Sequence, residues 1–168
     1  MRLPVDDKET VEECVKRARA AQAAWSKTSF AERRSVLRLL LRAVRDNAED
    51  ICRVSSLDTG KTRMEGMLGE IMVSLEKLTW VCTYGEEVLA PEHRPTSLPT
   101  LHKEAKVMYE PLGVIGVLAP WNYPFHNMLN HVCAIFCGNA VVVKMSEYSA
   151  LSAELYARLF QSVLIEAG

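Results

Sequence analysis

The chain has 168 residues, of which 49% are hydrophobic and 24% are charged. These values are typical of one globular domain, or of one domain and part of another, and they exclude disordered, collagen-like and mucin-like chains. Twenty basic and 21 acidic side chains give a net charge of −1. The sequence lacks the overall basic charge of nucleic-acid-binding proteins, so no nucleic-acid partner is expected.

The sequence shows no membrane span, because no apolar run reaches the roughly 18 residues that crossing a bilayer requires. The first seven residues lack the basic start and apolar core of a signal peptide. The five cysteines are odd in number and lie in apolar, helix-like contexts. This pattern favours a reducing compartment over a disulfide framework, so an intracellular, cytoplasmic location is expected.

The first half of the chain shows helical periodicity. Apolar side chains recur at helical spacing over residues 6–26, and Ser29 with Glu32 matches a capping box that begins a second helical stretch. Gly60 is placed to end that stretch. A third helix is predicted over about 62–84. Its predicted inward side chains are Leu68, Ile71, Met72, Leu75, Leu78 and Cys82.

The pattern changes after residue 90. Three prolines, Pro91, Pro95 and Pro99, lie close together and exclude a helix, which predicts an exposed crossing or a sheet-edge segment. The alternation of side chains over 103–109 then allows a strand.

The last third of the chain has an α/β rhythm. Residues 114–119 form a continuous apolar run, as in a strand buried on both faces. A helix is predicted after Pro124, a second strand over 140–143, and a last helix with Ser149 at its N-cap. This order predicts a parallel sheet with right-handed crossovers.

Two strand ends could carry chemistry, since ligands of open parallel sheets bind outside the carboxyl ends of the strands. The first end is followed by residues 120–124, a rigid loop with two prolines. Asn122 in this loop could donate an N–H to an oxygen that becomes negative in a transition state. The alternative is that Asn122 only caps a helix or turn.

At the second end, Lys144 and Glu147 could bind the two hydroxyls of a ribose, and the alternative is an exposed salt bridge. Residues 113–116 do not fit the G-x-G-x-x-G pattern, so the standard Rossmann glycine signature is absent. Cys133 and Cys137 lie four apart on an apolar helix, but no second pair of ligands completes a zinc site, and no metal is expected.

Taken together, several segments closely resemble the aldehyde dehydrogenase superfamily. The strongest similarity lies in residues 110–116, 120–124 and 138–147, in this order and at these spacings. Weaker similarity covers Leu57–Lys61, Ala23–Trp25 and Ala31–Arg33. The resemblance runs from about residue 6 to residue 168.

The resemblance implies an α/β fold in which a helical N-terminal portion leads into part of a Rossmann-like parallel sheet, that is, an incomplete aldehyde dehydrogenase fold. Residues 1–90 would be the N-terminal helical part of the NAD(P)-binding domain. Residues 91–111 would hold the proline-rich segment and the start of the oligomerisation hairpin, and residues 112–168 the first βαβα part of the Rossmann-like domain. The complete protein would then be a homo-oligomer.

The resemblance also implies oxidation of an aldehyde to a carboxylic acid with NAD(P)+. Asn122 matches the asparagine that helps form the oxyanion hole. Lys144 and Glu147 match the pair that holds the adenosine ribose, and because Glu147 would repel a 2′-phosphate, NAD is favoured as cofactor while Lys144 is compatible with NADP. The other matched cofactor-binding residues are Leu118, Ala119, Pro120, Trp121 and Ser146.

The family's nucleophilic cysteine and general-base glutamate lie beyond the point where this chain stops. None of the five cysteines occupies the place of the nucleophile. The chain is therefore expected to be a fragment of an oxidoreductase that is inactive alone. The alternative is a non-catalytic, truncated binding or assembly module that pairs through the proline-rich region.

Overall fold

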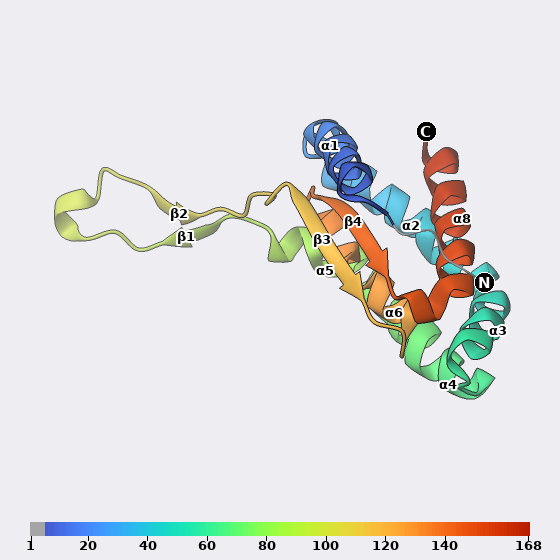
Figure 1. The fold of residues 1–168 in the computed structure, drawn as a ribbon. Helices are drawn as coiled ribbons and strands as arrows, with labels where there is room; N and C mark the ends of the chain where they lie inside the picture. The colour runs from blue at the N-terminus through green and yellow to red at the C-terminus, as the bar shows by residue number, and fades with distance from the viewer. Residues whose placement is uncertain (1–5) are drawn as a thin grey trace.

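The computed structural model describes residues 6–168, and Figure 1 shows a helical body from which a long hairpin projects. The body includes a two-stranded parallel sheet, and the hairpin is a second, antiparallel two-stranded sheet. The helices and strands are α1 (Lys8–Trp25), α2 (Phe30–Asp46), α3 (Ala48–Thr59), α4 (Arg63–Gly66), the π-helix η1 (Met67–Met72), α5 (Val73–Val88), β1 (Glu92–Arg94), β2 (Ala105–Val107), β3 (Val114–Ala119), α6 (Pro124–Leu129), α7 (Val132–Phe136), β4 (Ala140–Met145) and α8 (Ala150–Ala167). Short 3₁₀ turns lie at η2 (Leu98–Thr100) and η3 (Glu147–Ser149).

The local signals of the first half act as the sequence predicts. Ser29 and Glu32 form both hydrogen bonds of a capping box at the start of α2. Gly60 has φ +75° and ends α3 in the left-handed region, where glycine has no steric penalty. The second helical stretch is interrupted at Asn47, so it forms two helices, α2 and α3.

The third predicted helix is present, but part of its predicted inward face is wrong. Ile71, Leu78 and Cys82 are buried, whereas Leu68 and Met72 are exposed. The cause is η1, since the wider π-turn shifts the helical phase. Within η1, Glu70 is buried in the core beside Ile71.

The hairpin confirms that the proline-rich stretch is exposed and without α-helix, although Pro99 lies in the 3₁₀ turn η2. β1 pairs antiparallel with β2, with His93 opposite Lys106, and the 3₁₀ turn η2 lies between them. Figure 1 shows this arm extending away from the helical body.

The central sheet confirms the predicted parallel pairing. β3 and β4 pair parallel, from Val114 opposite Ala140 to Ala119 opposite Met145, so β4 runs two residues further than predicted. The expectation that β3 is buried on both faces is wrong. Of the six residues of β3, only Ala119 is buried, and Leu118 is 81% exposed. A two-stranded sheet leaves much of each strand without a covering layer.

The helix predicted after Pro124 is also broken. It forms α6 and α7, which are separated at Asn130 and His131. Ser149 stands at the N-cap of α8 as predicted, but its hydroxyl donates to the Ser146 carbonyl and does not cap the helix.

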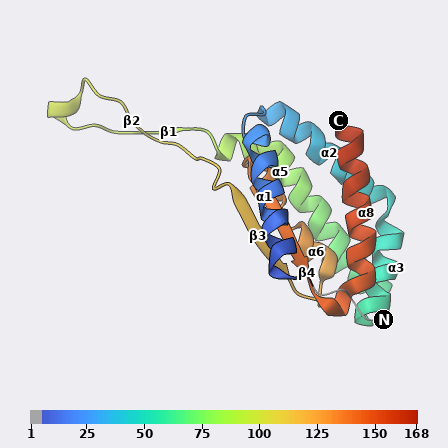
Figure 2. The ribbon, with the colours of Figure 1, turned by 45° about the horizontal axis from the view of Figure 1, so that its top comes forward.

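The helices pack into one apolar core around the sheet. α8 contacts α2 and α3, α2 contacts α5, and α1 lies alongside β4 and β3, as Figure 2 shows from a second direction. The largest apolar side chains in the core are Tyr156, Phe125, Phe136, Leu37, Ile51, Ile71, Leu78 and Leu129. No helix among residues 6–168 is both long enough and apolar enough to cross a bilayer.

Candidate functional site

The two candidate loops both lie at the carboxyl end of the parallel sheet. Leu118 lies opposite Lys144 and Ala119 opposite Met145 in the parallel register, so both strands end together. The Pro120–Tyr123 loop leaves one strand and the Ser146–Glu147 segment leaves the other. Pro120, Trp121 and Asn122 are exposed there, and Ala119 is buried beneath them.

Lys144 and Glu147 form an exposed ion pair at the end of β4. The Lys144 Nζ lies 3.5 Å from Glu147 Oε2. The backbone N–H of Glu147, followed by the Lys144 ammonium, holds the pKa of the Glu147 carboxyl below its usual value. The carboxylate is therefore ionised at neutral pH and can accept hydrogen bonds from hydroxyl groups.

Ser146 caps the turn that presents Glu147. Its hydroxyl oxygen accepts a hydrogen bond from the Tyr148 backbone N–H at 3.3 Å. A serine hydroxyl that accepts this bond keeps its own hydrogen free to donate.

The side chain of Asn122 has a defined orientation. Its Oδ1 accepts a hydrogen bond from Asn127 Nδ2 at 3.2 Å. Within residues 6–168 the Asn122 Nδ2 has no hydrogen-bond acceptor, and the side chain is exposed. The amide therefore presents its N–H groups outward, as a donor to a ligand oxygen requires. The N-cap residue of α6 is Tyr123, whose side chain makes no cap hydrogen bond.

Two buried side chains that the sequence reasoning missed hold this loop from beneath. Lys61 Nζ lies 2.7 Å from Glu70 Oε1 and donates to the Asn122 carbonyl at 2.6 Å. Glu70 Oε2 accepts from the backbone N–H groups of Phe125 at 2.7 Å and His126 at 3.4 Å. The same helical stretch also carries Glu65 and Glu76, so nothing in the sequence distinguishes Glu70 from the other carboxylates.

No metal site is present in the part of the chain that the structure describes, where no three His, Cys, Asp or Glu side chains come together. Cys133 and Cys137 lie partly buried in the core and are unpaired. Burial raises the pKa of the Cys137 thiol, which keeps it protonated and unreactive.

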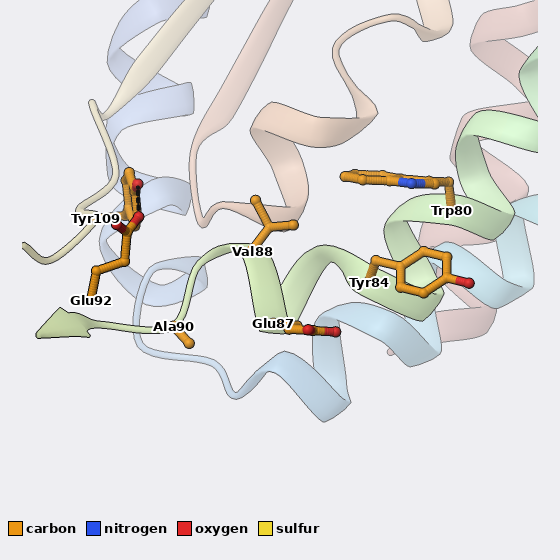
Figure 3. A pocket seen from close by; sticks show the side chains of 7 residues that line it. All are labelled: Trp80, Tyr84, Glu87, Val88, Ala90, Glu92 and Tyr109. Atoms are coloured by element: carbon orange, nitrogen blue, oxygen red, sulfur yellow. Dashed lines mark hydrogen bonds between the residues drawn. The ribbon is translucent and has the colours of Figure 1, made fainter.

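A separate hollow lies where α5 meets the base of the hairpin, away from the carboxyl ends of β3 and β4. It has a volume of about 560 Å³ and is lined by exposed aromatic side chains, including Trp80, Tyr84 and Tyr109. Figure 3 shows Tyr109 beside Glu92, and the Tyr109 hydroxyl donates to that carboxylate at 2.7 Å. The hollow is at the amino end of β3, opposite to the end that carries Asn122 and Lys144.

Comparison with known proteins identifies the family. The sequence model of the aldehyde dehydrogenase family matches residues 1–168. The chain belongs to this family. The match spans the candidate loops and the helices beneath them.

Two fungal relatives are similar over nearly the whole chain. An aldehyde dehydrogenase-like protein of Schizosaccharomyces pombe is 43% identical over 163 residues, which is 96% of this chain and 31% of that protein. One of Saccharomyces cerevisiae is 40% identical over 168 residues, which is 96% of this chain and 26% of that protein. The chain thus spans about a third or less of the relatives' length.

The fold is also that of the family. The succinic semialdehyde dehydrogenase of Streptococcus pyogenes, solved in complex with NADP+, superposes with a TM-score of 0.84 at 21% identity. The superposition covers 100% of this chain and 36% of that one. The expected incomplete aldehyde dehydrogenase fold is therefore confirmed.

Proposed function

We propose that these residues supply the ribose-binding pair and one oxyanion donor of an NAD(P)+-dependent aldehyde dehydrogenase. The whole protein would convert an aldehyde, water and NAD(P)+ to a carboxylate, NAD(P)H and two protons. The observation that carries the proposal is the parallel register of β3 and β4. This register brings Asn122 and the Lys144–Glu147 pair to the carboxyl end of the sheet.

The residues at this edge fit a dinucleotide. An exposed ammonium and an ionised carboxylate 3.5 Å apart offer a donor and an acceptor to vicinal hydroxyls. Leu118 and Trp121 are exposed apolar surfaces beside them, suited to contact with flat rings or sugars. Ala119, Pro120 and Ser146 complete the proposed lining. The chemistry supplied by bound NAD(P)+ is acceptance of a hydride.

Asn122 is proposed as the catalytic residue of this chain. Attack on an aldehyde carbon moves negative charge onto the carbonyl oxygen, and an N–H donor already aimed at that oxygen lowers the barrier. Asn122 suits this role because Asn127 fixes its Oδ1 and leaves the Nδ2 hydrogens directed outward.

The carboxylate of Glu147 sets the proposed cofactor preference. It would bind ribose hydroxyls and repel a 2′-phosphate, so NAD+ is preferred to NADP+. Lys144 is compatible with NADP+ binding, because its ammonium attracts phosphate.

The proposed domains are residues 1–90 for the helical part, 91–111 for the hairpin segment and 112–168 for the βαβα part. The hairpin is proposed to mediate contact between subunits of a homo-oligomer. Leu98 and Leu101 at the hairpin tip are 83% and 68% exposed, and a partner subunit would cover them in the proposed homo-oligomer. The five unpaired cysteines support the intracellular placement.

The test is Asn122→Ala in a full-length protein that carries these residues. Loss of an oxyanion donor lowers kcat by about 10²–10³, while the Kd for NAD+ stays unchanged. NADH formation from a panel of aldehydes gives kcat, and quenching of tryptophan fluorescence gives the Kd.

The matched control is Asn47→Ala, which removes an asparagine at the α2–α3 junction, away from the strand ends. Wild-type protein that makes no NADH from any aldehyde would refute the proposed activity. Equal kcat in Asn122→Ala and the control would refute the role of Asn122.

A further inference from the structure

A buried ion pair lies directly under the loop that carries Asn122. The Lys61 side chain is 9% exposed and that of Glu70 is 1% exposed, and their N–O distance is 2.7 Å. Taking two charges out of water is costly, and an apolar pair of the same size can stabilise a fold equally well. The pair therefore calls for an account other than stability alone.

The free hydrogen-bonding capacity of the pair is directed at one segment, residues 122–126. Lys61 donates to the Asn122 carbonyl at 2.6 Å and lies 4.0 Å from the centre of the Tyr123 ring. Glu70 accepts from Phe125 and His126 N–H with Oε2, while its other oxygen takes Lys61 and the Ser55 hydroxyl. Both ends of the segment are thus tied to the same two side chains.

The helix beneath is shaped to allow these contacts. Glu70 lies in the π-turn η1, and its side chain is buried. At the preceding residue, a Cβ on Gly69 would come within 2.6 Å of the Tyr123 ring. A π-turn, a glycine and a buried carboxylate therefore occur together where the loop rests.

We propose that Lys61 and Glu70 are positioning residues that hold the 122–126 segment so that the Asn122 amide faces the reacting oxygen. The inference rests on the proposed function, because it assigns Asn122 as the oxyanion donor. Neither side chain reaches the exposed face itself, so both act through Asn122. A donor displaced by about 1 Å can lose about 10²-fold in rate.

The test compares Glu70→Gln, Lys61→Met and the double variant Lys61→Met/Glu70→Leu in the full-length protein. Glu70→Gln keeps the side-chain size and is the mildest change. We expect kcat to fall by about 10- to 100-fold in all three, with KM and the Kd for NAD+ within about threefold of wild type. Val44→Ala, a core change in α2 distant from the loop, is the control for lost stability.

The double variant separates positioning from stability. Each single variant at Lys61 or Glu70 leaves the other charge buried without its partner. The double variant leaves no buried charge. Its melting temperature should recover above that of Lys61→Met, while its kcat stays low because the loop contacts are still missing. Variants that melt earlier but keep wild-type kcat, as Val44→Ala should, would overturn the inference.

A second readout does not depend on activity. Amide hydrogen exchange at Phe125 and His126 should be about tenfold faster in Glu70→Gln than in Val44→Ala, because a charge-assisted hydrogen bond is lost. Unchanged exchange there would overturn the positioning role, even if the wild-type protein proved to oxidise no aldehyde. Absence of wild-type activity with faster exchange would instead reject the proposed function and retain the contact of the pair with the loop.

Discussion

If Glu147 sets the cofactor preference as proposed, its removal should change the ratio of the NAD+ and NADP+ affinities. In the full-length protein, Glu147→Ala should weaken NAD+ binding and leave NADP+ binding weakened less or improved. We expect the NAD+/NADP+ preference to shift by roughly tenfold or more. Glu154→Ala removes an equally exposed carboxylate from an α8 ion pair and should leave the ratio unchanged. If both variants leave it unchanged, Lys144 and Glu147 form only a surface salt bridge.

His131 is expected to make the stability of the fold depend on pH. Burial lowers its pKa from 6.5 to about 4, and its Nδ1 has no hydrogen-bond partner among residues 6–168. The folded state therefore favours the neutral ring, and its stability contribution is complete above pH 6.5 and is lost as the pH falls toward 4. At about 1.4 kcal/mol per pKa unit, the loss between pH 7 and pH 5 is about 2 kcal/mol. His131→Gln should lose correspondingly less in denaturant titrations at the two pH values, and equal losses would contradict the assignment.

At the scale of elements, two helical glycines should respond oppositely to alanine. A Cβ at Gly85 in α5 would lie 2.6 Å from the ring of Phe136, which is buried and stacked on Phe30. Overpacking costs about 1–3 kcal/mol, more than the roughly 1 kcal/mol that alanine gains over glycine in a helix. At Gly66 the nearest atom is Cys52 Sγ at 3.4 Å, so Gly66→Ala should gain about 0.5–1 kcal/mol. Thermal melts should move in opposite directions, and a shift of the same sign would contradict this packing.

At the scale of the whole molecule, the unpaired edges of the two-stranded sheet are expected to make the 168-residue chain unstable when it is expressed alone. β3 and β4 each have one edge without a strand partner within residues 6–168. Open edges template pairing with other chains, so we expect the chain expressed alone to aggregate or to unfold partially. Light scattering and a thermal melt test this expectation. A monomer with a sharp, cooperative melt would contradict it.

The same incompleteness predicts that the isolated chain oxidises no aldehyde. Burial raises the pKa of Cys52, Cys82 and Cys137, and a protonated thiol is a poor nucleophile. Incubation of the purified chain with NAD+ and a panel of aldehydes should give no NADH above background. Formation of NADH would show that one of these cysteines, or another group of the chain, can act as the nucleophile.

The sequence by itself determined the features that depend on near neighbours. The Ser29–Glu32 capping box, the end of α3 at Gly60 and the apolar strand from Val114 are each set by a few adjacent residues, and all are present. The sequence also placed Asn122 and Lys144 near strand ends, and parallel pairing puts both at the carboxyl end of the sheet.

The tertiary structure alone decided what lies beneath Asn122. Lys61 donates to the Asn122 carbonyl across 61 positions of the chain, and Glu70 is buried within the π-turn η1. The periodicity of a single helix predicts neither contact, because both depend on the segment that packs against the helix. A buried carboxylate becomes favourable only once a lysine and the N–H groups of another segment surround it.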